Sequence, residues 1–263
     1  MFKNIALAFS FLTQIPFKFS EVKESQLIQA LGYFPLVGVF EGLLLSLVAY
    51  LSSLFLSLEL GSLFCILILL LIRGIFHLDG FSDTADALWV KSSGDYTKDV
   101  EKRLKIMKES TVGVGGVVAL VLNLFFRFIL IKEILQKELF WGAFVLSATF
   151  SKGFIVPIIY LSKPAKKEGI GALLITSITL KEVFWALFFT SLVFLIWVFF
   201  NFSPFLKLIY LLIYWGWLFF LALLIKRFFE KRFSGLTGDN LGALMEFLEI
   251  GFLLFWGVLW LKL

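Results

Sequence analysis

The sequence predicts an all-α, polytopic integral membrane bundle, and three observations predict it. Of the 263 residues, 60% are hydrophobic and 16% are charged, whereas soluble domains carry roughly a quarter charged residues. Several apolar stretches approach the ~20 residues that an α-helix needs to cross a bilayer. The charged residues gather between these stretches. We therefore expect one integral membrane domain covering residues 1–263.

About seven transmembrane helices are expected, over residues 31–56, 62–77, 113–131, 139–161, 183–200, 204–225 and 241–261. A further segment, 2–17, precedes them. We interpret it as an interfacial or re-entrant helix, because Pro16 ends it too early for a full crossing.

The distribution of basic residues predicts the orientation of the bundle. Of the 24 Lys and Arg residues, 17 fall in segments 1–30, 77–112, 162–182 and 226–240. By the positive-inside rule these segments are cytoplasmic, which places the N-terminus inside and the C-terminus outside. Because the basic residues lie in these loops, the net charge of +5 does not indicate a nucleic-acid partner. The one cysteine, Cys65, lies in an apolar run, so no disulfide is expected.

The stretch FHLDGFSDTADAL, residues 76–88, gathers acidic residues after an apolar run. Asp79, Asp83 and Asp86 are spaced i, i+4 and i+7, so on a helix they share one face. Three like charges need a cation, and Mg²⁺ prefers oxygen ligands. The alternative is that the aspartates end a span and face water. The apolar neighbours favour a metal site, with His77, the only histidine, beside it.

The stretch RLKIMKESTVGVGG, residues 103–116, combines basic residues with glycines. Arg103, Lys105 and Lys108 are candidate phosphate ligands, and exposed N–H groups around Gly113–Gly116 would add to them. Close helix packing is the alternative role for the glycines. The positive-inside rule also accounts for the lysines.

Acidic residues inside predicted spans are functional candidates, because a charge in the bilayer is costly. Glu41, Glu246 and Glu249 lie in such spans, and Asp239 begins the last one within GLTGDN. Asp239 is also a candidate helix N-cap. For Glu246 and Glu249 the alternative is an ion pair with Arg73 or Lys152.

Three basic residues also lie within predicted spans: Arg73, Arg127 and Lys152. Each would face a partner or a wet cavity inside the bundle. Since Arg73 and Lys152 lie near predicted span ends, snorkelling to the interface is the alternative, and it applies to Arg127 on the outer side.

Taken together, these motifs resemble the cobalamin synthase family, also called adenosylcobinamide-GDP ribazoletransferases. The matching motifs are FLTQIPF, YFPLVGVFEG, FHLDGFSDTADAL, RLKIMKESTVGVGG, KKEGIG and GLTGDNLGALMEFLEIG. They appear in the family's order from residue 11 to residue 251. The resemblance therefore covers nearly the whole chain.

The resemblance implies an Mg²⁺-dependent phosphotransferase of the cytoplasmic (inner) cell membrane, with its active site on the cytoplasmic face. It would join adenosylcobinamide-GDP to α-ribazole or α-ribazole 5′-phosphate and release GMP. By position, Asp79, Asp83 and Asp86 match the family's acidic metal motif. Thr237, Asp239 and Glu246 match its C-terminal block. The chain departs from the family at KEST, where Arg-Asp-Ser-Arg is common, and at Lys152, where Arg is common.

From these residues we predict the roles in the site. Asp86 is the first candidate for the general base, His77 the second, and Asp239 is a base or a further metal ligand. The predicted substrate-binding residues are Arg103, Lys105, Lys108, Lys152, Thr237 and Glu246. A homo-oligomer is compatible with the sequence.

Two other functions compete with this reading. A CDP-alcohol-type lipid head-group phosphotransferase would carry D-x-x-D-G-x-x-A-R, and the Ala-Arg pair is missing here. A cation-coupled transporter would trace intramembrane acids across the bilayer, often on paired broken helices. The acids of this chain instead crowd towards one face.

Overall fold

All regular structure in the described part of the chain is helical apart from one isolated bridge. The computed structural model describes residues 1–109, 111–201 and 205–259. A 3₁₀ turn, Leu31–Tyr33, leads into α3, and a π turn, Phe255–Leu259, follows α12. The helices are α1 Phe2–Leu12, α2 Glu24–Ala30, α3 Phe34–Phe55, α4 Leu58–Arg73, α5 Phe76–Leu88, α6 Tyr96–Ile106, α7 Val114–Gln136, α8 Phe140–Tyr160, α9 Ile170–Ser177, α10 Leu180–Asn201, α11 Phe205–Phe233 and α12 Gly238–Leu254.

The predicted class, a polytopic helical membrane bundle, is confirmed. Among the described residues, six helical segments are long and apolar enough to cross a membrane, and they comprise all or most of α3, α7, α8, α10, α11 and α12. α4 and α5 pass that test only as a pair that meets at a 94° bend, so up to seven spans are present. The chain is therefore a multi-pass membrane protein. The predicted span limits at 204 and at 261 lie outside the described residues.

The bend after α4 is a difference from the single span predicted over 62–77. α4 ends at Arg73, and Gly74 turns the chain with a φ of +69°, a backbone conformation that favours glycine. The segment after α1 fits into this elbow, where Gln14 N–H donates to the Ile72 carbonyl at 2.6 Å. The elbow redirects the chain, so that α5 begins its own helix.

The first helix, α1, has 11 residues and is too short to cross a bilayer. It ends at Leu12, where Thr13 takes up extended backbone before Pro16 is reached. The prediction that residues 2–17 make no full crossing is confirmed for this helix. Its place at the membrane interface stays a prediction.

α8 and α12 lie at the centre of the bundle, and α10 and α11 lie at its outside. In the apolar stretch of each helix that could cross the membrane, 78% of the residues of α8 and 72% of those of α12 are buried. The corresponding shares are 17% for α10 and 28% for α11. The outer helices expose large apolar side chains such as Leu195, Phe199 and Trp217. An apolar exterior of this kind suits contact with lipid.

α3 packs on α8 through a pair of glycines spaced four apart, Gly38 and Gly42. A Cβ on Gly38 would lie 2.6 Å from Thr149 Cα, and one on Gly42 would lie 2.7 Å from the Phe144 carbonyl oxygen. Small residues at this spacing let two membrane helices approach backbone to backbone. This contact carries Glu41, between the two glycines, into the bundle.

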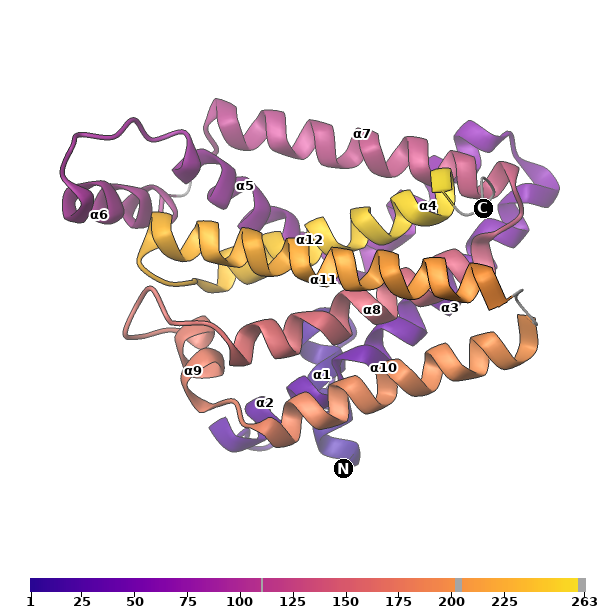
Figure 1. Cartoon of the computed structure of the whole chain (residues 1–263), viewed down its shortest axis with the longest axis horizontal. Coiled ribbons are helices and arrows are strands. Elements are labelled where there is room, and N and C mark those ends of the chain that lie inside the picture. The colour runs from indigo at the N-terminus through magenta and orange to yellow at the C-terminus, as the bar shows by residue number, and fades with distance from the viewer. Residues whose placement is uncertain (110, 202–204, 260–263) are drawn as a thin grey trace.

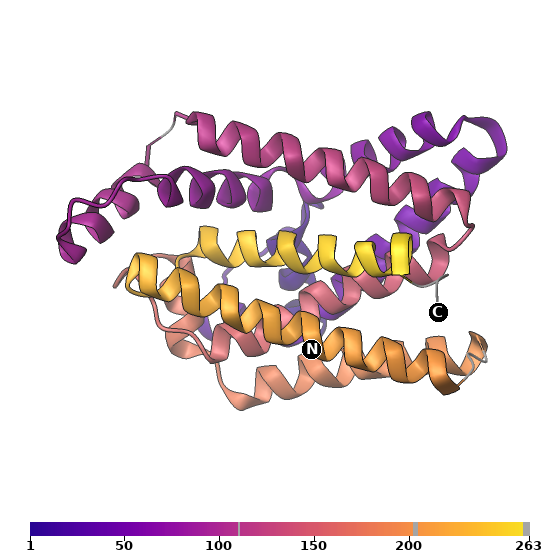
Figure 2. The same cartoon turned by 45° about the horizontal axis from the view of Figure 1, so that its top comes forward.

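The long loops gather at one end of the bundle. Figures 1 and 2 show α6, α9 and the segments that join α5 to α7, α8 to α9 and α11 to α12 at the same end of the long helices. The short connection between α7 and α8 lies at the opposite end. The motif-bearing loops therefore share one face, as the sequence predicts.

Cys65 lies inside the core, with 0% of its surface exposed.

Candidate active site

Asp86, in the last turn of α5, fixes the start of α7. Its Oδ2 accepts the Gly113 N–H and its Oδ1 accepts the Gly116 N–H, both at 2.7 Å. The carboxylate thus caps a helix N-terminus, where backbone N–H groups favour negative charge. A Cβ on either glycine would approach an Asp86 oxygen to 2.5 Å. These two N–H groups therefore serve Asp86, and not a substrate phosphate directly.

α5 and α12 touch backbone to backbone at Gly80. A Cβ on this glycine would lie 2.8 Å from Asp239 Cα and 2.9 Å from the Asp239 carbonyl oxygen. Only glycine allows such an approach. The contact brings the first turn of α12 beside the aspartates of α5.

Four aspartates meet at this crossing, and we call them the acid cluster: Asp79, Asp83, Asp86 and Asp239. Asp83 interacts electrostatically with the other three carboxylates and with the Lys166 ammonium group, which also attracts Asp239. Asp83 and Asp239 are half-buried and Asp79 is exposed. The predicted helix over the α5 aspartates is confirmed, and the cluster has a surplus of negative charge.

The start of α12 is held by a capping box. The Thr237 hydroxyl accepts the Asn240 N–H at 3.2 Å, and Asn240 Oδ1 accepts the Thr237 N–H at 3.0 Å. Asn240 Nδ2 also donates to Thr84 on α5 at 3.0 Å. Thr237, which we predicted to bind substrate, is thus a buried cap. Our sequence reasoning missed Asn240, although the T-x-x-N spacing is close to a capping-box signature.

The loop after α8 is joined to the turn before α12, which places Lys166. Leu236 N–H donates to the Lys163 carbonyl at 2.7 Å, and Ala165 N–H donates to the Leu236 carbonyl at 2.9 Å. Gly235, with a φ of +149°, lies directly against the backbone of Pro164 and Ala165. The KKEG segment is therefore fixed beside the acid cluster.

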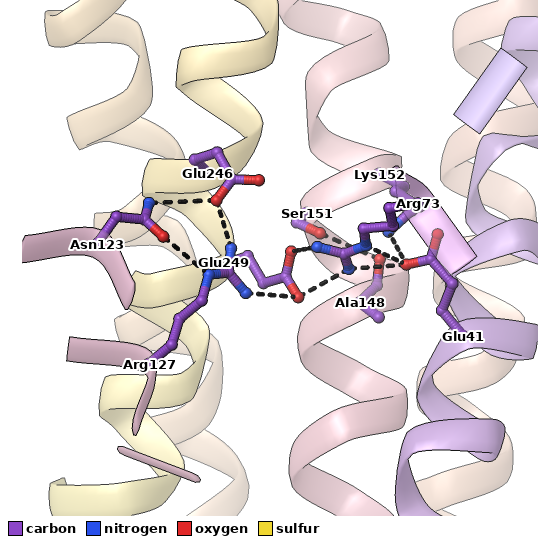
Figure 3. Close-up of polar contacts among 9 residues, drawn as sticks. All are labelled: Glu41, Arg73, Asn123, Arg127, Ala148, Ser151, Lys152, Glu246 and Glu249. Carbon is purple, nitrogen blue, oxygen red and sulfur yellow. Dashed lines mark hydrogen bonds and ion pairs between the residues drawn. The ribbon is translucent and has the colours of Figure 1, made fainter. Parts of the chain in front are cut away.

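A second set of charges lies deep among the spans, and we call it the core ion network (Figure 3). Every member is at most 8% exposed, and the members are Glu41, Arg73, Arg127, Lys152, Glu246 and Glu249. Arg73 donates to Glu41 at 2.7 Å and forms two hydrogen bonds to Glu249, at 2.5 and 2.8 Å. The network joins α3, α4, α7, α8 and α12. Three acids balance three bases.

Two predicted substrate ligands, Lys152 and Glu246, belong to this network, and their substrate-binding roles stay predictions. Lys152 Nζ donates to Glu41 Oε2 at 2.6 Å. Glu246 Oε2 accepts from Arg127 at 2.5 Å and from Asn123 at 3.2 Å. Both side chains are buried and paired, because an unpaired charge at this depth would be costly.

The alternatives left open for the buried charges are now resolved. Snorkelling is wrong for Arg73, Arg127 and Lys152, which all face the bundle interior. The alternative of an ion pair with Arg73 is confirmed for Glu249, whereas Glu246 pairs with Arg127. We overlooked Asn123, although a polar residue in an apolar span, four residues before Arg127, is a signal that could have found it.

His77 lies between the two charged regions. It precedes Asp79 on α5 and lines a cavity of about 20 Å³ with Arg73, Arg127 and Glu246. That volume holds about one water molecule. Gly242 of α12 packs against the His77 backbone, since a Cβ there would lie 3.4 Å from His77 Cα. The imidazole therefore borders the core ion network, and Asp79 of the acid cluster follows two residues later on α5.

Comparison with known proteins identifies the family. A family model described as cobalamin-5-phosphate synthase matches residues 4–257. The chain belongs to this family.

Curated relatives agree with the family match over nearly the full length. The chain is 39% identical to the adenosylcobinamide-GDP ribazoletransferase of Thermodesulfovibrio yellowstonii, over 97% of this chain and 95% of that protein. It is 31% identical to the protein of that name from Caldanaerobacter subterraneus, over 98% of each chain. It is 30% identical to that of Clostridium novyi, over 96% of this chain and 95% of that protein. No solved structure matches.

The donor chemistry of this cobalamin-5-phosphate synthase family member suits a hard divalent ion. Among the described residues no group of three or more His, Cys, Asp and Glu side chains is placed to hold a metal ion. Mg²⁺ does not require such a cage, because it usually keeps several waters and binds one or two carboxylates plus substrate phosphates. Asp79 and Asp83, one helical turn apart on α5, are carboxylates of this kind. Mg²⁺ binding at the acid cluster stays a prediction.

The basic residues predicted to bind phosphate lie in different surroundings in the structure. Lys105 and Lys108 are exposed on and after α6. Arg103 is buried and donates to the Arg232 carbonyl at the end of α11, at 3.1 Å. Arg103 thus lies at a contact between α6 and α11. The substrate-binding roles of Arg103, Lys105 and Lys108 stay predictions.

Proposed function

We propose that this protein is an adenosylcobinamide-GDP ribazoletransferase that acts late in the assembly of cobalamin. A ribose hydroxyl of α-ribazole or its 5′-phosphate attacks the cobinamide phosphate. The new P–O bond forms as the bond to GMP breaks, and the hydroxyl proton passes to a carboxylate. The observation that carries the proposal is the family match over residues 4–257.

The acid cluster is where we place this chemistry. Asp79 and Asp83 would hold Mg²⁺, which would supply charge stabilisation for the leaving phosphate of GMP when bound. Lys166, attracted by Asp83 and Asp239, lies where it can contact a substrate phosphate. The donor brings a diphosphate to this face, so the surplus of negative charge would be compensated only when the cation is bound.

For the proton acceptor we favour Asp239 over Asp86. Both carboxylate oxygens of Asp86 already accept backbone N–H groups, so its first role is to hold the Gly113–Gly116 turn. Among the described side chains, the hydrogen bond that the Asp239 carboxylate accepts is a long one, 3.4 Å, from the Thr237 hydroxyl. It is half-buried at the α5–α12 crossing and is free to accept a proton.

The location follows from the same proposal. The loops at the α6 and α9 end of the bundle would face the cytoplasm, with the protein in the cytoplasmic membrane and its N-terminus inside. The basic residues of these loops support that orientation.

The test is a transfer assay on the protein in lipid vesicles. Adenosylcobinamide-GDP, α-ribazole 5′-phosphate and Mg²⁺ are supplied, and corrinoid product and GMP are followed by chromatography, with and without EDTA. We expect EDTA to abolish the product and Asp83→Asn to lower the rate at least about 100-fold, equivalent to about 2.7 kcal/mol of barrier.

Glu101→Gln is the matched control, because it removes one exposed carboxylate on α6 outside the cluster. It should keep the wild-type rate. Product formed by Asp83→Asn at the wild-type rate would remove the acid cluster from the mechanism. No product from folded wild-type protein would overturn the proposed function itself.

A further inference from the structure

A second polar pocket lies between α6 and the end of α11. Its volume is about 290 Å³, and it opens to solvent beside residues that the acid cluster does not use. Its lining includes Ser92, Tyr96, Asp99, Arg103, Lys231 and Arg232. Nothing in the proposed chemistry at the α5–α12 crossing accounts for this pocket.

The charge of the pocket is positive. Three cations face one carboxylate, and that carboxylate is already fully engaged: Asp99 accepts from the Ser92 hydroxyl, from Ser93 N–H at 2.7 Å and from the Ser93 hydroxyl at 2.8 Å. These bonds lower the pKa of Asp99 to about 2. Asp99 therefore serves to shape the loop before α6. The cations remain for a ligand.

Arg103 gives the pocket a buried donor. Only 3% of its surface is exposed, yet among the described residues its Nε–H has no hydrogen-bond partner. Its Nη1 donates to the Arg232 carbonyl at 3.1 Å, and Asp99 approaches Nη2 only to 4.0 Å. A buried charged donor left without a partner is costly, so an arginine kept in this state indicates that an anionic oxygen completes it.

We propose that this pocket binds a phosphate monoester, the 5′-phosphate of the phosphorylated acceptor. The inference rests on the proposed function and deepens it. In adenosylcobinamide-GDP both phosphates are bridged to other groups, so the donor has no terminal phosphate. Phosphorylated α-ribazole ends in a dianionic one. Arginine matches phosphate oxygens with its planar fork, and lysine adds a point charge.

The place of the pocket agrees with the geometry of the transfer. α6 follows α5 in the chain and packs against it, so the pocket and the acid cluster lie at the same end of the bundle (Figure 1). The 5′-phosphate and the attacking hydroxyl sit on the same ribose but on different carbons. A clamp on the phosphate would therefore orient the hydroxyl without touching it, which makes Arg103 and Lys231 specificity residues for the phosphorylated acceptor.

The test compares two acceptors in vesicles of phosphatidylcholine alone. For Lys231→Gln, an exposed position, we expect the KM for α-ribazole 5′-phosphate to rise at least about 10-fold. The KM for α-ribazole and the kcat should stay unchanged. Arg103→Gln should act in the same direction and more strongly. Because Arg103 is buried, Lys231→Gln decides the question if Arg103→Gln does not fold.

Matched controls remove an exposed charge from the same helices outside the lining: Lys102→Gln on α6 and Arg227→Gln on α11. Neither should change either KM. An equal effect of Lys231→Gln on both acceptors would overturn the inference.

Two further arms separate other sources of phosphate. If Lys231→Gln weakens inhibition by GMP and leaves the KM for the phosphorylated acceptor alone, the pocket belongs to the leaving nucleotide and the inference is wrong. If an effect appears only when anionic lipid is added, a lipid headgroup occupies the pocket and the inference is again wrong. If the wild-type protein is inactive with both acceptors, the proposed function is wrong, and the inference that rests on it is wrong as well.

Discussion

The core ion network and the acid cluster use charge in opposite ways. In the network, three acids and three bases are paired and almost fully buried. In the acid cluster, four aspartates lie partly open to solvent, and Lys166 attracts two of them, Asp83 and Asp239. A low-dielectric interior tolerates charges only when they are paired with opposite charges. A helix crossing that is open to solvent can carry a surplus of negative charge.

The difference indicates what each region is for. The network ties five helices together and pairs each of its charges with an opposite one, so it suits a structural role. It also counts against a cation-coupled transporter, because Glu41, Glu246 and Glu249 are engaged by Arg73, Arg127 and Lys152. The acid cluster is incomplete without a cation, so it suits binding and catalysis.

The strongest test of the comparison removes the centre of the network. Arg73→Met leaves Glu41 and Glu249 buried with part of their compensation gone, and we expect a loss of about 3–5 kcal/mol in folding free energy. Thermal unfolding in detergent measures it. The matched control is Lys132→Gln, which breaks an exposed pair with Glu59 and should cost less than about 1 kcal/mol. Equal effects of the two variants would mean that the network is not a structural clamp.

A smaller effect is expected where the acid cluster meets α7. Gly116→Ala places a Cβ 2.5 Å from Asp86 Oδ2, so the hydrogen bonds that hold the turn must break or shift. We expect a loss of about 1–3 kcal/mol, together with reduced transfer. Gly216→Ala on α11 is the control, because nothing lies within 4 Å of its added Cβ. A Gly116→Ala protein with wild-type stability and rate would contradict the role assigned to Asp86.

The smallest predicted effect has the opposite sign. Asp83→Asn removes one of several repelling charges, so we expect stability in the absence of metal to rise by about 0.5–1 kcal/mol while transfer is lost. Thermal unfolding in EDTA measures the change. Removing a charge from the core ion network, as in Arg73→Met, should lower the folding free energy instead. The sign of the stability change therefore separates a functional charged residue from a structural one. A destabilised Asp83→Asn protein would place Asp83 with the structural group.

Local sequence patterns predict the helices and the shared face of the α5 aspartates. Apolar length predicts spans because the bilayer has a fixed thickness. The i, i+4, i+7 spacing predicts one face because it follows the helical period. Both arguments use residues close together in the chain, and the structure bears out both.

The partners of the charged residues could not be predicted in this way. Lys152 meets Glu41 across 111 positions of sequence, and Asp86 meets Gly113 across 27. Such contacts depend on how helices pack and in which register. The elbow at Gly74 is a similar case, because an apolar stretch has the same composition whether it runs straight or turns. The sequence therefore indicates which charged residues are unfavourable to bury. The fold determines whether each of them is paired with another residue of the protein or is left to bind a ligand.

Because Cys65 is the only cysteine and is fully buried, the natural chain should not react with water-soluble thiol reagents. A single new cysteine would then report the side of the membrane it occupies, with no background to subtract. In intact cells, Lys91→Cys in the loop before α6 should escape a membrane-impermeant maleimide, and Gln136→Cys at the opposite end should react. The reverse labelling pattern would turn the whole bundle over and put the acid cluster outside the cell.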